Sequence, residues 1–373
     1  MAKLTFFPVE NGDTTLIEFG DGRLMLVDYC HRAKGEDDCE PCIDLASSLG
    51  ALLAELGREY IDVVVLTHRH DDHVAGAEAF FSLDHAAAYQ GDGRIAIGEL
   101  WVPASMVLAT GLAGSARVMR EEARHRIKQG SGVRIFSAPG ALDDIAADLG
   151  VSEEEMGALI VGAGEIAPGW TADDGEVEVF VHSPFAANCE PEAEEEDTNG
   201  SSIILHLTFF PGENPTPVLL GADAEWEVWK HVVELTEQNG NDTRLDWDVF
   251  KVAHHCSYTA LAQEAGDGET VPEEGVDRLF DHAQNGAIVV ASSNPIACEG
   301  TPPHEEAASY YRSIAANAAG QFFVTMEYPS QDAPEPLVIE IGEYGPAEKR
   351  SESARWSGAG AVIGSRSSRY GPQ

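Results

Sequence analysis

Three histidines and an aspartate fall within six residues of one another, in the segment Thr67-His68-Arg-His70-Asp-Asp72-His73. Imidazole and carboxylate groups are common ligands of divalent metal ions. His68 and His70 alternate as strand residues do, so both rings can face one metal, while Asp72 and His73 lie just beyond and suit a second. We therefore predict that His68, His70, Asp72 and His73 bind metal, and that Asp72 also orients the reacting water.

Two later segments offer the further ligands that a two-metal site needs. Asp223 ends one apolar, strand-like run, and the adjacent His254 and His255 follow another. We predict that Asp223 bridges the metals, although the cap of a helix that begins near Glu225 would suit the same residue. Because successive side chains of a strand point to opposite sides, we expect only one of the two histidines to face the metal.

The elements that must position these residues have an α/β rhythm. Residues 61–66 form a short, apolar, β-branched run, as expected of a strand buried on both faces. The histidine-rich segment follows it directly, and sites of α/β proteins usually form at the carboxyl ends of such strands. Residues from about 98 to 167 are rich in Ala, Glu and Arg with helical periodicity, which we interpret as a helical insertion or cap.

We predict one domain over residues 1–345, followed by a flexible, basic, Ser/Gly/Arg-rich tail over residues 346–373. The whole chain is strongly acidic, with a net charge of −41 from 64 acidic and 23 basic residues. Such a field repels nucleic acid unless basic residues gather locally. We interpret it as an aid to solubility, with a surface for a protein partner as the alternative. The chain has no apolar run near the roughly 18–20 residues that span a bilayer and no signal-peptide pattern, so we expect a cytoplasmic protein without a membrane partner.

Cys30, Cys39 and Cys42 form a small cluster beside His31. Three thiolates and an imidazole can close a structural zinc site. A single CxxC pair is common without a metal, however, and in a cytosolic chain these cysteines are also consistent with plain reduced thiols. Both interpretations remain open from the sequence.

The order HxHxDH, strand-end Asp, then strand-His-His-x-Ser resembles that of the metallo-β-lactamase superfamily. More narrowly, it is similar to the branch that contains the hydrolase domain of ComEC-type DNA-uptake proteins. This likeness extends over roughly residues 3–342 apart from the insertion, and residues 251–257 differ from the branch pattern by Cys256 in place of a glycine. The stretches that carry it are residues 7–13, 24–28, 199–205, 251–257 and 292–304.

The resemblance implies a four-layer αββα sandwich with two divalent ions, Zn²⁺ or Mn²⁺, at one edge between the sheets. It gives His68 and His70 to the first metal, Asp72 and His73 to the second, and Asp223 to the bridge. For the last ligand of the second metal it leaves three histidines. We favour His254 over His304, and we give His255 a substrate contact or the donation of a proton.

One departure from the superfamily concerns the first metal. Many members carry a further histidine before the bridging aspartate, whereas the matching stretch here reads Asp197-Thr-Asn199-Gly-Ser. Asp197 or Asn199 can serve instead, and oxygen ligands favour Mn²⁺ over Zn²⁺. His182 is near in sequence, but we interpret it as structural.

Two divalent ions roughly 3.5–4 Å apart activate a bridging water and clamp the oxygens of a displacement. The ComEC-type resemblance favours phosphodiester hydrolysis, hence a nuclease acting on DNA or RNA, or a phosphodiesterase acting on a small nucleotide. Hydrolysis of a carboxylic ester, lactone or thioester is one alternative. A metal-binding component of a protein complex without catalysis is the other.

Overall fold

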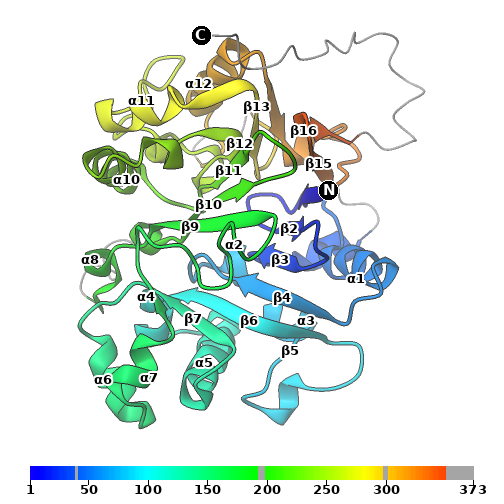
Figure 1. Cartoon of the computed structure of the whole chain (residues 1–373). Coiled ribbons are helices and arrows are strands. Elements are labelled where there is room, and N and C mark those ends of the chain that lie inside the picture. Colours follow the sequence, from blue (N-terminus) through cyan, green and yellow to red (C-terminus); the bar gives the residue numbers. More distant parts are fainter. Residues whose placement is uncertain (38–40, 192–197, 297–300, 350–373) are drawn as a thin grey trace.

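Two β-sheets lie face to face in the computed structural model, and helices cover the outer face of each (Figure 1). The structure describes residues 1–37, 41–191, 198–296 and 301–349. Within these ranges the layers follow the order helices, sheet, sheet, helices, so the predicted αββα architecture is confirmed. None of the described helices is both long and apolar enough to cross a bilayer.

The first sheet has ten strands in the described part of the chain, in the order β16-β15-β1-β2-β3-β4-β6-β7-β8, with β5 paired to β6. β1 to β3 form an antiparallel meander, whereas β3, β4, β6, β7 and β8 run parallel. The strands are β1 (Ala2–Phe6), β2 (Thr15–Glu18), β3 (Leu24–Val27), β4 (Tyr60–Val65), β5 (Phe81–Ser82), β6 (Ile95–Pro103), β7 (Val133–Phe136), β8 (Ile160–Val161), β15 (Leu337–Gly342) and β16 (Gly345–Glu348).

The second sheet has six strands among the described residues, in the order β14-β13-β12-β11-β10-β9. β9, β10 and β11 are antiparallel, and β11 to β14 run parallel. Their bounds are β9 (Val177–Ser183), β10 (Ile204–Phe209), β11 (Thr216–Leu220), β12 (Trp247–Lys251), β13 (Ala283–Ala291) and β14 (Gln321–Val324).

The helices divide between the two outer layers (Figure 1). Those between β3 and β8 lie on the first sheet, and α10, α11 and α12 lie on the second. Their bounds are α1 (Leu45–Glu55), α2 (Asp71–Val74), α3 (Ala77–Phe80), α4 (Ala104–Leu108), α5 (Gly114–Gln129), α6 (Leu142–Leu149), α7 (Glu153–Gly157), α8 (Ala186–Cys189), α10 (Trp226–Gln238), α11 (Glu274–Phe280) and α12 (Glu305–Asn317).

Three apolar cores hold the four layers together. One lies between the sheets and includes Val65, and one lies under the helices of the first sheet and includes Leu49 and Ile127. The third joins the second sheet to its helices through residues such as Trp229 and Tyr311. Full burial of one such side chain stabilises the fold by about 1.5–3 kcal/mol. The strands whose ends carry the candidate site are therefore held firmly by the packing on both of their faces.

The structure adds detail at two of the predicted boundaries. Besides helices, residues 98–167 contain most of β6 and all of β7 and β8, which continue the first sheet. β7 and β8 are short, and the longer helix α5 between β6 and β7 dominates the periodicity of the segment. At the other end, β16 pairs with β15 beyond the predicted domain end at residue 345. The remainder of the predicted tail, residues 350–373, lies outside the described residues.

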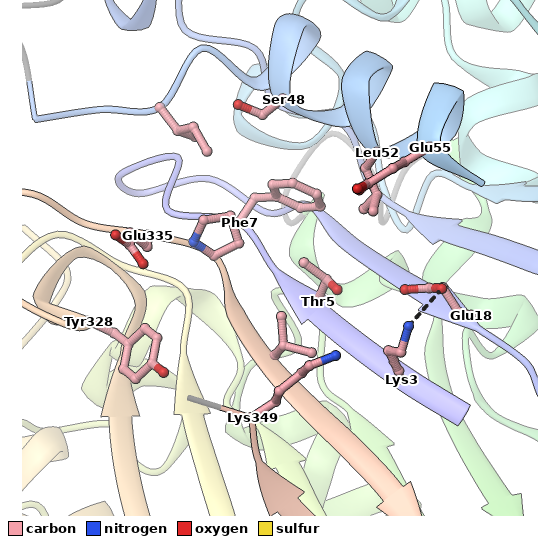
Figure 2. A pocket seen from close by; sticks show the side chains of 13 residues that line it. Lys3, Thr5, Phe7, Glu18, Ser48, Leu52, Glu55, Tyr328, Glu335 and Lys349 are labelled. Carbon is pink, nitrogen blue, oxygen red and sulfur yellow. Dashed lines mark hydrogen bonds and ion pairs between the residues drawn. The ribbon is translucent and has the colours of Figure 1, made fainter. Parts of the chain in front are cut away.

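A cavity of about 590 Å³ opens between α1 and the outer face of the first sheet (Figure 2). Its floor includes Phe7 and Leu52, and Nζ of Lys3 is 3.3 Å from Oε2 of Glu18 on its wall. None of its lining residues belongs to the predicted metal site. This cavity is therefore separate from the predicted metal site.

Candidate metal centre

The carboxyl ends of four strands, two from each sheet, bring the predicted ligands together. β3 leads to Asp28, and β4 leads to the HxHxDH segment. In the second sheet β11 leads to Asp223, and β12 leads to His254 and His255. Since β3–β4 and β11–β12 are parallel pairs, their carboxyl ends lie at one edge of each sheet.

One group of ligands contains Asp72, His73, Asp223 and His255, and their ligand atoms lie within 4.8 Å of one another. Nε2 of His73 is 3.2 Å from Oδ1 of Asp223. Nε2 of His255 is 3.4 Å from Oδ2 of Asp223 and 3.3 Å from Oδ2 of Asp72. The Nε2 atoms of both histidines and Oδ1 of Asp223 are buried and make no hydrogen bond of good geometry with the described residues. Because buried polar atoms are rarely left so, these atoms fit a bound cation.

A second group contains His68, His70 and Asp72. Nε2 of His68 is 3.2 Å from Nδ1 of His70 and 3.7 Å from Oδ2 of Asp223. Asp72 thus belongs to both groups, and Asp223 reaches both. The set of imidazoles and carboxylates suits Zn²⁺, and its oxygen atoms also suit Mn²⁺.

Outer partners fix how the two inner histidines are turned. Oδ2 of Asp28 accepts a hydrogen bond of 2.7 Å from Nδ1 of His73, and both carboxylate oxygens accept from Thr67. Nδ1 of His255 donates to the carbonyl oxygen of Ser292 over 2.9 Å. A histidine whose Nδ1–H is held in this way presents Nε2 to a metal.

Asp28 itself stands in the left-handed region, with φ of 58°, which is uncommon for a residue other than glycine. Such strain gathers at functional sites, where the surroundings hold it in place. Asp28 lies in residues 24–28, one of the stretches that carry the family resemblance, but no role was predicted for it. Its position at the end of an apolar strand, the same signal that singled out Asp223, could have identified it.

The structure reverses the predicted placement of His254 and His255. His255 lies within the ligand group, whereas Nδ1 of His254 is 3.0 Å from Oγ1 of Thr259 and 3.3 Å from Oε1 of Glu225. The prediction extended strand alternation past Lys251, where β12 ends. Residues 254–256 instead turn with φ values of 49°, 50° and 65°, which sends the second histidine inward.

His182 and His304 lie outside both ligand groups. Nε2 of the buried His182 donates to the carbonyl oxygen of Arg244 over 2.9 Å, and burial lowers its pKa to about 3. Nδ1 of His304 accepts from the backbone N–H of Tyr258 over 3.4 Å. These contacts agree with a structural role for His182 and speak against His304 as the final ligand.

No further His, Cys, Asp or Glu of the described residues joins His68, His70 and Asp72 in the second ligand group. Asn199 is buried, and its Nδ2 donates to Oε1 of Glu225 over 3.4 Å, so its role as a substitute ligand stays a prediction. Asp197, the other predicted substitute, lies outside the described residues.

The predicted cysteine site is only partly described. Cys30 and Cys42 are buried, and neither joins a metal-like group among the described residues. Burial raises the pKa of Cys30 to about 12, so this thiol resists ionisation. Cys39 lies outside the described residues, and the structural zinc site stays a prediction.

Opposite charges shift the pKa values of the inner ligands. Burial by itself would raise the pKa of Asp223, but the imidazoles of His73 and His255 outweigh it and hold the pKa well below its usual range. Conversely, burial would lower the pKa of His255, but Asp223 and then Asp72 raise it to about 10. A metal must therefore displace protons from these histidines, and its binding will weaken at low pH.

Comparison with known proteins agrees with this arrangement. Residues 8–92 match the model of the family described as the metallo-beta-lactamase superfamily. That stretch includes the HxHxDH motif and Asp28. Residues 8–92 are thus similar to the metallo-β-lactamase superfamily, and the α/β layers of the described chain are consistent with that fold. No curated protein is similar enough to count as a match.

Three solved structures are similar at low identity. The chain covers 75% of MEM-A1, a subclass B3 metallo-beta-lactamase from a soil metagenome library, with 67% of its own length, 12% identity and a TM-score of 0.33. It covers 97% of unliganded yeast PDE1 with 87% of its length, 10% identity and a TM-score of 0.41. The third is a diphosphatase of the PhnP family. The match covers 90% of this chain and 89% of the diphosphatase, at 10% identity and a TM-score of 0.33. At such scores none of them specifies a substrate for this chain.

Proposed function

We propose that this protein is a hydrolase that depends on two divalent ions, Zn²⁺ or Mn²⁺. The observation that carries the proposal is the pair of adjacent ligand groups that share Asp72, with buried Nε2 atoms turned towards Asp223. In this assignment Asp223 would bind both ions. His68 and His70 would hold the first ion, and Asp72, His73 and His255 would hold the second.

Other roles in the reaction fall to side chains near the ions. Bound divalent ions would supply Lewis-acid polarisation of the scissile group and a more acidic water. The side chain of Asp72 is 30% exposed and that of Asp223 only 2%, so Asp72 is the carboxylate that a water or substrate can reach. Asp72 accordingly accepts a hydrogen bond from the attacking water and orients it. His254, held by Glu225 and Thr259 and 22% exposed, contacts the substrate.

A phosphodiester is the substrate class that we propose. Arg69 lies between the ligands His68 and His70 in the sequence, and it lines a cavity of about 180 Å³ together with Ser105 and Thr110. A guanidinium group suits the oxygens of a phosphate, which a neutral ester or lactam does not offer. The resemblance to the ComEC-type branch supports the same class, while the net charge of −41 favours short substrates over long nucleic acids.

The test is a metal analysis followed by a panel of substrates. We expect about two equivalents of a divalent ion per chain after reconstitution with Zn²⁺ or Mn²⁺. The loaded protein should hydrolyse bis(p-nitrophenyl) phosphate faster than p-nitrophenyl acetate or a thioester, and a chelator should abolish the reaction until metal is restored. Asp72→Ala should remain folded but lose turnover. Absence of bound metal would refute the hydrolase, and a preference for the acetate or thioester would refute only the phosphodiester.

A further inference from the structure

A buried ion pair joins the two sheets directly behind the ligand groups. Lys251 is the last residue of β12, and Asp13 lies in the loop between β1 and β2. The ammonium of Lys251 contacts Oδ2 of Asp13, and the two residues are only 4% and 2% exposed. Lysine is almost never buried to this degree unless it is paired.

The surroundings of this ammonium resemble a cation site. Asp13, Asp28 and His73 offer ligand atoms within 4.8 Å of one another, and all three are buried. Oδ2 of Asp13, the atom that contacts Lys251, is also 3.8 Å from Nδ1 of His73. Two carboxylates buried so close together need positive charge nearby, because an uncompensated buried charge is strongly destabilising. The ammonium of Lys251 brings a positive charge to this place.

The ion pair also connects residues of both sheets to the candidate metal centre. The backbone N–H of Asp13 donates to the carbonyl oxygen of Asp72 over 3.0 Å. On the other side, Lys251 precedes the ligand His255 by four residues on the same stretch of chain. One contact therefore links the segment that carries Asp72 and His73 to the segment that carries His255.

We propose that Lys251 is a positioning residue whose ammonium pairs with Asp13 and offsets the buried negative charge of Asp13 and Asp28. Through Asp13 it holds the ligands from the two sheets at the separation that the second metal requires. Asp13, its ion-pair partner, is not a proposed metal ligand, and the inference rests on the proposed function only in taking Asp72, His73 and His255 as ligands.

The test compares Lys251→Met with Arg126→Met. Arg126 is the matched control, because it also forms a buried ion pair. Its Nε is 2.7 Å from Oε1 of Glu122, and the two side chains are 7% and 0% exposed. Neither residue belongs to a ligand group. Both variants should unfold at a lower temperature than the wild type, because each removes the cationic partner of a buried carboxylate. Only Lys251→Met should weaken the binding of one Zn²⁺, by about 10–100-fold in competition with a chromophoric chelator. It should also alter the visible spectrum of the Co²⁺-loaded protein, which reports ligand geometry.

A double variant covers the case in which Lys251→Met does not fold. Asp13→Asn combined with Lys251→Met removes both charges, so it should be less destabilised than either single variant while still binding the metal more weakly. Wild-type affinity and an unchanged Co²⁺ spectrum in this variant would overturn the positioning role. If instead the wild type binds no divalent ion, the proposed function fails. The stability cycle of Asp13 and Lys251 then still shows whether the two charges are coupled.

Discussion

Two pairs of buried histidines in this molecule have opposite surroundings. His73 and His255 lie in the candidate metal centre and are 0% and 3% exposed. His182 and His206 lie on neighbouring strands of the second sheet and are 4% and 1% exposed. Burial is therefore nearly equal, and it does not by itself distinguish a metal ligand from a structural histidine.

The partners of the rings make the difference. The Nε2 atoms of His182 and His206 are each 2.9 Å from a backbone carbonyl oxygen, of Arg244 and Asp246 respectively. In the metal centre the backbone and carboxylate partners hold Nδ1 instead, and Nε2 faces a second carboxylate. A histidine that is bound at one nitrogen and faces a carboxylate with the other is arranged for a cation.

The same difference appears in the pKa values. Burial lowers the pKa of His182 to about 3 and that of His206 to about 4, so these rings stay neutral. Asp223 reverses the effect of burial at His255 and raises its pKa to about 10. The neighbouring carboxylates, and not a difference in the depth of burial, account for the opposite pKa shifts of His255 and the structural pair.

The largest expected effect separates His255 from its neighbour. His255→Ala removes a ring from the ligand group, so we expect it to lose one of the two ions and all measurable turnover. His254→Ala should keep both ions, because its ring binds Glu225 and Thr259, while turnover falls by about 10²–10⁴-fold if the ring assists the reaction. Metal content and turnover of the two variants decide the matter. Loss of metal from His254→Ala alone would restore the assignment predicted from the sequence.

A smaller effect should follow from changing Asp28 to asparagine. The substitution keeps the size of the side chain but removes the charge that holds Nδ1 of His73. We expect the affinity for one ion to fall by about 10–100-fold, as is typical when the outer partner of a ligand is lost. Asp62→Asn, in the same sheet but outside the ligand groups, is the control and should bind metal as the wild type does. Equal affinities in all three proteins would show that Asp28 does not orient His73.

The smallest effect is a dependence of stability on pH that comes from the structural pair. The pKa of histidine is about 6.5 in an unfolded chain, and burial lowers it in the folded protein to about 3 at His182 and about 4 at His206. Between these values the unfolded state binds more protons, so stability is lost as the pH falls below about 6.5. At pH 5 each ring should cost about 2 kcal/mol of the free energy of unfolding.

Denaturant titrations of the metal-loaded protein at pH 7, 6 and 5 test this expectation. His206→Gln should flatten the loss of stability relative to the wild type, and its metal content should not change. In the metal-free protein His255 acts in the opposite sense, because its raised pKa adds stability below about 6.5 that is lost as the pH rises towards about 10. An identical pH dependence in the wild type and His206→Gln would remove the contrast between the two pairs.

The sequence alone was sufficient for features that depend on local pattern. The apolar run before Thr67 predicted β4, and it correctly placed the HxHxDH segment at the carboxyl end of a buried strand. The apolar run before Asp223 likewise predicted a strand, which the structure shows as β11. In each case one apolar strand ends in one polar residue, and the parallel topology gathers those ends at a single edge.

Two features could not be predicted because they depend on backbone conformation or on distant contacts. Nothing in the letters of His254, His255 and Cys256 requires all three to adopt a left-handed φ, which cancels the alternation that the prediction used. The pairing of Asp13 with Lys251 joins positions 238 residues apart. No periodicity in a single sequence links such positions, and only the meeting of the two sheets reveals the pair.

The placement of β15 in the first sheet has a consequence for the biosynthesis of the protein. β1 is synthesised long before β15, yet β15 is one of its two neighbours, with Ala2 opposite Ile341. Pairing across so long a loop is slow, since its ends must first meet. Until residues 337–342 emerge, β1 keeps one edge unpaired and available for aggregation. The nascent chain thus carries β1 with one edge unpaired until β15 has been made.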